Sequence, residues 1–215
     1  MVSWTRSHTV AVYLVWVMAL VGIGRSPYLP GAEQSEQALA GKQEPPGKVS
    51  ETLGQPERIN VKALQFEANG QPINNQTSEA AGFVLIADGA GPQVAVLAHA
   101  GVLVACVRRG ETVQVGIPLP QRAGAFSLSA RVDLLAGETA EVELSVEGNN
   151  VARTLRGDQE VALNVHGVGS GGGPLLRLIS RGSGVDAAIR WREIRSEMAG
   201  KSAPIGWALE PKTVP

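Results

Sequence analysis

Few residues in this sequence could support acid–base or metal chemistry, and they are far apart. Of the three histidines, His8 lies in an apolar N-terminal segment, His99 lies in the turn Ala98-His99-Ala100-Gly101, and His166 ends an expected strand on its polar side. A zinc site needs three or four ligands from His, Cys or carboxylates. No pair here has ligand spacing, so we interpret His99 and His166 as surface residues.

The single cysteine, Cys106, lies in the apolar run 102–107. A thiol in such a run behaves as a small hydrophobic side chain. One cysteine forms no internal disulfide, and a lone thiol is compatible with an oxidising compartment without proving one. We therefore expect Cys106 to be buried and unreactive.

Two short motifs look like nucleophile or phosphate-binding signatures but fail at a required position. Around Ser170, the Gly-x-Ser-x-Gly motif has Val168 in place of its first glycine. Gly200-Lys201-Ser202 is similar to the end of a phosphate-binding loop, but Arg195 stands where the earlier glycine is required. The glycine-rich run 167–173 has no helix expected after it, so we interpret it as a flexible hairpin loop.

Carboxylates give no clearer signal. Glu141, Glu143 and Glu147 share one face of one expected strand, which is typical of a solvated surface, whereas acid–base catalysis needs two carboxylates that converge. A Ca²⁺ ion could be held by loop aspartates, but no Asp-x-Asp-x-Asp run supports such a site. The aspartates considered for it are Asp88, Asp158 and Asp186. The sequence therefore predicts neither an enzyme nor a cofactor.

The composition allows one sizeable domain with tails in 215 residues. Hydrophobic residues make up 44% and aromatic residues only 4%, so the core must be built from Val, Leu, Ile and Ala. Lys and Arg number 19 against 20 Asp and Glu, with no basic block. A protein that follows a phosphate backbone needs a positive face, so we expect no nucleic-acid partner.

The first 25 residues read as an export or anchoring signal. Residues 9–24 are uncharged and largely apolar, with an arginine before and after them. As a helix this stretch would be roughly 24 Å long, short of a comfortable bilayer span. We therefore expect a cleaved signal peptide or a retained anchor with Trp4 and Tyr28 at the interfaces. Both place the rest of the chain outside the cytoplasm, and a buried helix of the domain is the remaining alternative.

Residues 26–57 are rich in Pro, Gly, Gln, Glu and Ala and almost lack large apolar side chains. Such a stretch buries too little surface to offset its ordering entropy, which predicts a flexible linker. The folded domain is expected over 58–195, and an irregular tail over 196–215.

Within the domain, apolar and polar residues alternate, which predicts strands with one buried and one exposed face. The clearest runs are 112–117, 126–133, 140–147, 160–165 and 185–191. Less regular apolar runs at 82–87, 94–98 and 102–107 predict more central strands. With glycine-containing breaks between most runs, the pattern predicts an all-β antiparallel β-sandwich, with a closed barrel as the alternative.

The order of several motifs resembles a known family. The first motif is an expected strand that ends in Val96-Leu97-Ala98-His99-Ala100-Gly101. Three further motifs follow in order: Ile117-Pro118-Leu119-Pro120, Gly124-Ala125-Phe126 and Val132-Asp133-Leu134-Leu135-Ala136-Gly137. The last expected strand ends at Trp191. Over residues 82–194, this order is similar to that of galactose-binding-like, jelly-roll β-sandwiches, which include many carbohydrate-binding modules. The resemblance implies non-catalytic binding, commonly of a glycan, through end loops or a concave sheet face.

Glycan binding of this kind uses exposed aromatic rings, which stack on the apolar face of a sugar. The candidate rings are Phe66, Phe83, Phe126, Trp191 and Trp207. Alternation places Phe126 and Trp191 in the core, as is usual for aromatic rings, and leaves Trp207 as the ring expected to be exposed. The candidate ligand-binding residues are therefore Trp207, His99 and Asp88.

The sequence thus predicts an exported, non-catalytic module that binds a cell-surface or extracellular glycan. The first alternative is a structural protein of an envelope complex that contacts protein partners through its sheet edges, and the second is a secreted hydrolase. The membrane is a further expected partner, through the N-terminal segment. An exposed Trp favours glycan binding, and a long unpaired edge strand favours assembly. A cleft that joins His99 or His166 to a carboxylate favours the hydrolase.

Overall fold

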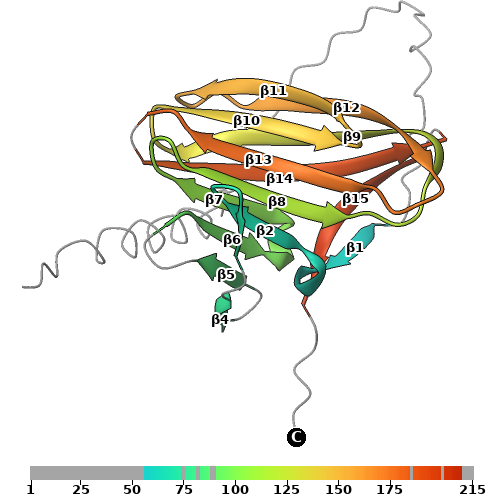
Figure 1. Cartoon of the computed structure of the whole chain (residues 1–215), viewed down its shortest axis with the longest axis horizontal. Coiled ribbons are helices and arrows are strands. Elements are labelled where there is room, and N and C mark those ends of the chain that lie inside the picture. The colour runs from blue at the N-terminus through green and yellow to red at the C-terminus, as the bar shows by residue number, and fades with distance from the viewer. Residues whose placement is uncertain are drawn as a thin grey trace, which may run out of the picture. The chain divides into compact units, whose positions relative to one another are not determined.

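The computed structural model describes residues 56–73, 76–80, 83–87, 91–184, 186–199 and 201–209, without the side chains of 76–80, 83, 87 and 99. The predicted signal or anchor and nearly all of the predicted linker lie outside the described residues. Strands dominate the described part and form two sheets (Figure 1). No helix in that part is long and apolar enough to cross a membrane.

The first sheet contains nine strands of the described chain. Its order is β1-β15-β14-β7-β6-β5-β4, and on the other side of β14 lies β9, followed by β12 at the edge. All pairs are antiparallel except β1 with β15. The strands are β1 (Glu57–Asn60), β4 (Gln76–Ala80), β5 (Phe83–Ala87), β6 (Gln93–Leu97), β7 (Val102–Val107), β9 (Ala123–Ala136), β12 (Val161–Ser170), β14 (Ala187–Met198) and β15 (Lys201–Ala208).

The second sheet contains six strands of the described chain, all antiparallel, in the order β11-β10-β13-β8-β2-β3. Two short 3₁₀ turns, η1 (Val61–Ala63) and η2 (Ala98–Ala100), connect strands. The strands are β2 (Gln65–Ala68), β3 (Gln71–Pro72), β8 (Thr112–Pro118), β10 (Thr139–Val146), β11 (Asn149–Arg156) and β13 (Leu175–Gly182).

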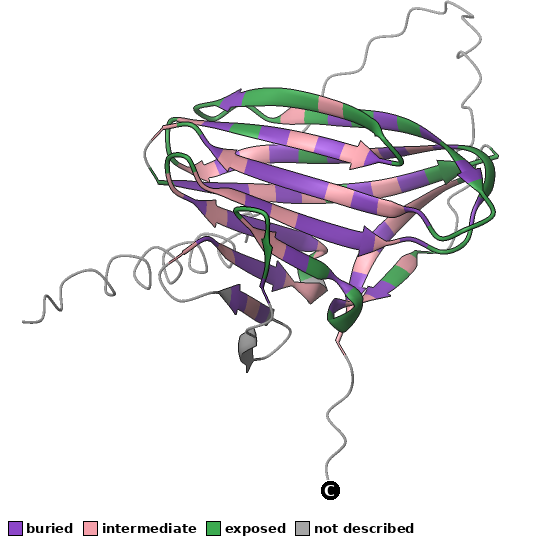
Figure 2. Ribbon diagram, viewed as in Figure 1, coloured by how far each residue is buried: buried purple, intermediate pink, exposed green. Residues whose placement is uncertain are grey.

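The inward faces of both sheets share one hydrophobic cluster, and burial alternates along many of the strands (Figure 2). As predicted, Phe126 and Trp191 are buried, with 4% and 0% of their surfaces exposed. The indole Nε1 of Trp191 on β14 donates a hydrogen bond of 2.9 Å to Oγ of Ser180 on β13. This bond joins the two sheets, and an unpaired buried donor would instead cost about 1–3 kcal/mol.

The predicted all-β class with two sheets is confirmed, and the central apolar runs form β5, β6 and β7. The predicted irregular tail is wrong over much of its length. Residues 196–198 complete β14, and β15 occupies Lys201–Ala208 between β14 and β1. The alternation of β15 is hard to see in the sequence because Pro204 and Gly206 interrupt it.

The interpretation of 167–173 as a flexible loop also needs correction, because β12 continues to Ser170. A Cβ atom on Gly167 would lie 2.4 Å from Cζ of Phe126, and one on Gly169 would lie 2.3 Å from the carbonyl oxygen of Arg122. These glycines therefore let the edge strand lie directly against the Phe126 ring and the Arg122 backbone.

We expect Gly167→Ala to destabilise the protein by about 2 kcal/mol, because the added methyl group must displace the Phe126 ring or β12. Urea unfolding of the full chain measures this. Gly172→Ala is the matched control, since nothing lies within 4 Å of the Cβ position at Gly172. Equal midpoints for the two variants would show that β12 does not depend on the close approach.

Candidate functional site

The outward face of β12, β9 and β14 brings polar residues from three distant segments into two rows. Opposite residues of paired antiparallel strands lie on the same face of the sheet. In the first row Ser127 lies between His166 and Glu197, and in the second Ser129 lies between Asn164 and Arg195. Leu128 and Ala130 of β9 are buried, so the intervening serines face away from the core. We call these residues the polar face: Ser127, Ser129, Asn164, His166, Arg195 and Glu197.

An open groove of about 460 Å³ lies at the first row and extends to Asn149, at the start of β11 in the other sheet. Its polar lining includes Ser127, His166 and Glu197. Beside this row the groove is apolar, with Ala125 opposite Val168 in the strand register. Val168 is 72% exposed. The groove thus places an apolar strip next to a row of hydrogen-bonding groups.

None of the six polar-face side chains has a hydrogen-bond or ion-pair partner in the described part of the protein. All six are exposed or partly exposed, so water can satisfy their donors and acceptors. A ligand that replaces this water finds free hydrogen-bonding groups, and no internal bond has to break.

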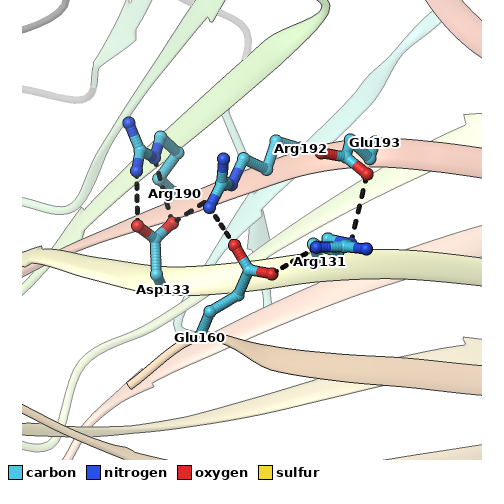
Figure 3. Close-up of polar contacts among 6 residues, drawn as sticks. All are labelled: Arg131, Asp133, Glu160, Arg190, Arg192 and Glu193. Carbon is cyan, nitrogen blue, oxygen red and sulfur yellow. Dashed lines mark hydrogen bonds and ion pairs between the residues drawn. The ribbon is translucent and has the colours of Figure 1, made fainter. Parts of the chain in front are cut away.

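The adjoining part of the same outward face is occupied by ion pairs (Figure 3). Asp133 accepts hydrogen bonds of 3.0 and 2.5 Å from Arg190. The hydrogen bond with Asp133 raises the pKa of the Arg190 guanidinium, although burial opposes the shift. Glu160 accepts from both Arg131 and Arg192. The network therefore bridges β9, β14 and the residue just before β12.

A β-bulge in β14 brings the network and the polar face onto one surface. The register with β9 shifts between Arg192 and Arg195, and Glu193 has a φ of 49°. The carboxylate of Glu193 lies 3.1 Å from Nε of Arg131. Because a bulge adds a residue to one strand, Arg192 and Arg195 lie on the same face although they are three positions apart.

A buried ion pair lies behind the groove. Arg122, only 4% exposed, donates hydrogen bonds of 2.7 and 2.6 Å to the two oxygens of Glu57 at the start of β1. The hydroxyl of Ser196 donates a bond of 2.7 Å to the same carboxylate. The guanidinium lies 5.7 Å from the centre of the Phe126 ring, and the Arg122 carbonyl accepts from the N–H of Gly171. Arg122 thus fixes β1, the groove lining and the end of β12 together.

The structure does not gather the three residues predicted from sequence into a site. Trp207 is 5% exposed, so the expectation of an exposed stacking ring is wrong. It lies on β15, where it points inward like Ile205. His99 lies in η2 but its side chain is not described, and Asp88 lies outside the described residues. His166, interpreted as a surface residue, is exposed and lines the groove.

The groove joins His166 to the carboxylate of Glu197, the arrangement expected to favour a hydrolase. The order of the row does not suit that chemistry. In a nucleophile–base–acid relay the histidine lies between the serine and the carboxylate, whereas here Ser127 occupies the middle position. No hydrogen bond links these described side chains. The described residues also contain no group of three or more His, Cys, Asp or Glu that could hold a metal ion.

No protein-family model and no curated protein matches the sequence. Solved structures similar to the chain include carbohydrate-binding modules, the group that the sequence resembles. One is TmCBM61 in complex with beta-1,4-galactotriose, at 8% identity and a TM-score of 0.38, covering 64% of this chain and 90% of the other.

Two further neighbours are of the same class. The CBM22-1 xylan-binding domain from Paenibacillus barcinonensis Xyn10C is 18% identical with a TM-score of 0.36, covering 66% of this chain and 88% of the other. A family 16 carbohydrate-binding module is 15% identical with a TM-score of 0.32, covering 49% and 85%. These neighbours are of the class that the sequence resembles, and similarity at this level assigns no ligand and no site residue.

Cys106, expected to be buried, is only partly buried, and we still expect it to resist alkylation in the native protein. Desolvation by burial, with a smaller contribution from the negative charge of Asp186, raises the pKa of the thiol to about 11. At pH 8 only about one thiol in a thousand would then be the reactive thiolate. Iodoacetamide labelling followed by mass spectrometry checks this, with urea-unfolded protein as the positive control. Equally fast labelling of native and unfolded chains would contradict it.

We expect Glu57→Gln to lower the free energy of unfolding by about 2 kcal/mol, because the buried Arg122 charge would lose its ionic partner. Glu193→Gln is the matched control. Glu193 and its partner Arg131 are 47% and 54% exposed, and pairs of that kind contribute about 0–1 kcal/mol. Urea denaturation of both variants measures the difference, and equal losses would show that the Arg122 pair does not anchor β1.

Proposed function

We propose that this chain is an exported, non-catalytic module that binds a glycan in the groove of the polar face. The observation that carries the proposal is the apolar strip of Ala125 and Val168 beside the unpaired row of His166, Ser127 and Glu197. A sugar ring presents a C–H face and an edge of hydroxyl groups. The strip would contact the face, while the row accepts from and donates to the hydroxyls.

The groove lacks an exposed aromatic platform. Of the aromatic side chains that the structure describes, Phe66, Phe126, Trp191 and Trp207 are all buried. An aliphatic strip offers less contact area than a ring, so we expect weak binding of a single glycan segment. A dissociation constant on the order of 1 mM corresponds to about −4 kcal/mol.

Export is proposed from the N-terminal sequence alone. The uncharged stretch 9–24 between two arginines supports passage across or retention at a membrane. Polymeric glycans of the cell surface or extracellular matrix would then be the ligands that the domain meets.

Assembly through a sheet edge is the second candidate function, and one observation favours it. β12 is a ten-residue edge strand without a charged side chain, and edge strands usually carry charges that prevent pairing with another chain. A protein partner could extend the sheet there by adding a strand.

We expect the full chain to bind polysaccharide on a glycan array, and Glu197→Ala to weaken that binding at least fivefold, because the groove would lose a charged acceptor. Glu141→Ala is the matched control, since Glu141 is exposed on β10 of the other sheet. Titration calorimetry with the best array ligand measures both variants. A blank array from a folded chain would sink the glycan proposal and favour edge assembly.

A further inference from the structure

We propose that the glycan bound in the groove is acidic, and that Arg195 receives its anionic group. This inference rests on the proposed function, because Arg195 belongs to the polar face next to the groove. The charged side chains on the outward surface of β9 and β14 differ in how each charge is compensated.

Arg195 differs from the other arginines of this surface. Arg131, Arg190 and Arg192 are each within ion-pair distance of a carboxylate. Those carboxylates are already shared in the network of Figure 3, where Asp133 contacts two arginines. Arg195 has no hydrogen-bond or ion-pair partner in the described chain, although it is only partly exposed. Its guanidinium donors are therefore free for a ligand.

The position of Arg195 is set by the strand register. It lies opposite Ser129, which lies opposite Asn164, so two neutral hydrogen-bonding side chains flank the cation on one side. Residues two apart on one strand are separated by about 7 Å, which is the spacing between this row and the groove row. A ring seated in the groove could thus extend a substituent to the second row.

The geometry and charge of the Arg195 guanidinium favour an anionic substituent. Its planar fork matches the two oxygens of a carboxylate and binds them bidentately. Ser129 and Asn164 could donate further hydrogen bonds to the same anion. A uronic acid or a sulfated sugar carries such an oxyanion on the edge of its ring.

Glu197 determines the orientation of the ligand in the groove. Its carboxylate is exposed, lines the groove and has no cationic partner within the described residues. It repels an anion and accepts from hydroxyls. The acidic group therefore points toward Arg195 and the second row, and a hydroxyl-bearing edge points toward Glu197.

Two matched pairs of polymers test the inference with the full chain. Polygalacturonate is compared with its carboxyl-reduced form, and dextran sulfate is compared with dextran, by affinity electrophoresis at low salt. We expect at least one acidic polymer to bind about tenfold more tightly than its neutral counterpart. A preference within the first pair identifies a carboxylate, and one within the second pair alone identifies a sulfate.

The variants are Arg195→Gln, Arg195→Lys and Arg177→Gln. Arg177 lies on the outward side of β13 in the other sheet, so its loss changes the net charge equally without touching the polar face. We expect Arg195→Gln to reduce the acidic-to-neutral ratio to about one and Arg177→Gln to leave it unchanged. Arg195→Lys, which keeps the charge but loses the fork, should give an intermediate ratio, and circular dichroism checks that each variant is folded.

The outcomes separate this inference from the function on which it rests. Equal binding of acidic and neutral polymers by the unmodified chain, or an unchanged preference in Arg195→Gln, overturns the acidic-ligand inference and leaves glycan binding standing. An equal loss of preference in Arg177→Gln also overturns it, because net charge alone would then explain the effect. Failure to bind any polymer, here and on the array, overturns both.

Discussion

The close approach of β12 to the Phe126 ring is the constraint on which the polar face depends. Gly167 and Gly169 leave no room for a side chain between the edge strand and the ring or the Arg122 backbone. With the strand held there, ten consecutive residues of β12 stay in register with β9. That register alone puts His166 beside Ser127 and Asn164 beside Ser129. A displaced β12 would separate the rows, so the contact that shapes the groove lies on the inward side of the sheet.

On one part of this sheet surface the charged side chains pair with one another, and on the other part the polar side chains have no partner in the described protein. In the first part, ion pairs bridge β9, β14 and the start of β12. Backbone hydrogen bonds set the spacing of these strands. Single exposed pairs contribute little to stability, and a network of several charges contributes more. In the second part six side chains at that same spacing have no partner in the described protein. The bulge at Glu193 is the boundary, because it sets Arg195 on this surface while Glu193 pairs back to Arg131.

Alternation in the sequence is enough to predict the all-β class and the inward direction of Phe126 and Trp191, since both depend on the local period. The strands β5, β6 and β7 are predicted from less regular apolar runs. Alternation does not predict β15, because Pro204 and Gly206 interrupt its period. The position of this strand is determined by its partners β1 and β14. For the same reason Trp207 was wrongly expected to be exposed. The rows of the polar face cannot be predicted from the sequence, because His166, Ser127 and Glu197 come together only through the register of three strands. The glycines of β12 read as a loop in the sequence. The group that requires Gly167 to lack a side chain is the Phe126 ring, which lies on another strand.

The glycan site proposed above is an open groove with an aliphatic strip, and this shape affects which kind of glycan would bind there. A monosaccharide would gain only a few hydrogen bonds and little apolar contact, which hardly exceeds the loss of its translational and rotational freedom. A polymer presents the same ring many times, so a segment that leaves the groove is replaced by its neighbour at high effective concentration. Because the groove is open, a long chain could lie in it without threading an end. Weak contact with each ring and repeated presentation by the polymer together favour a polysaccharide over a small free sugar.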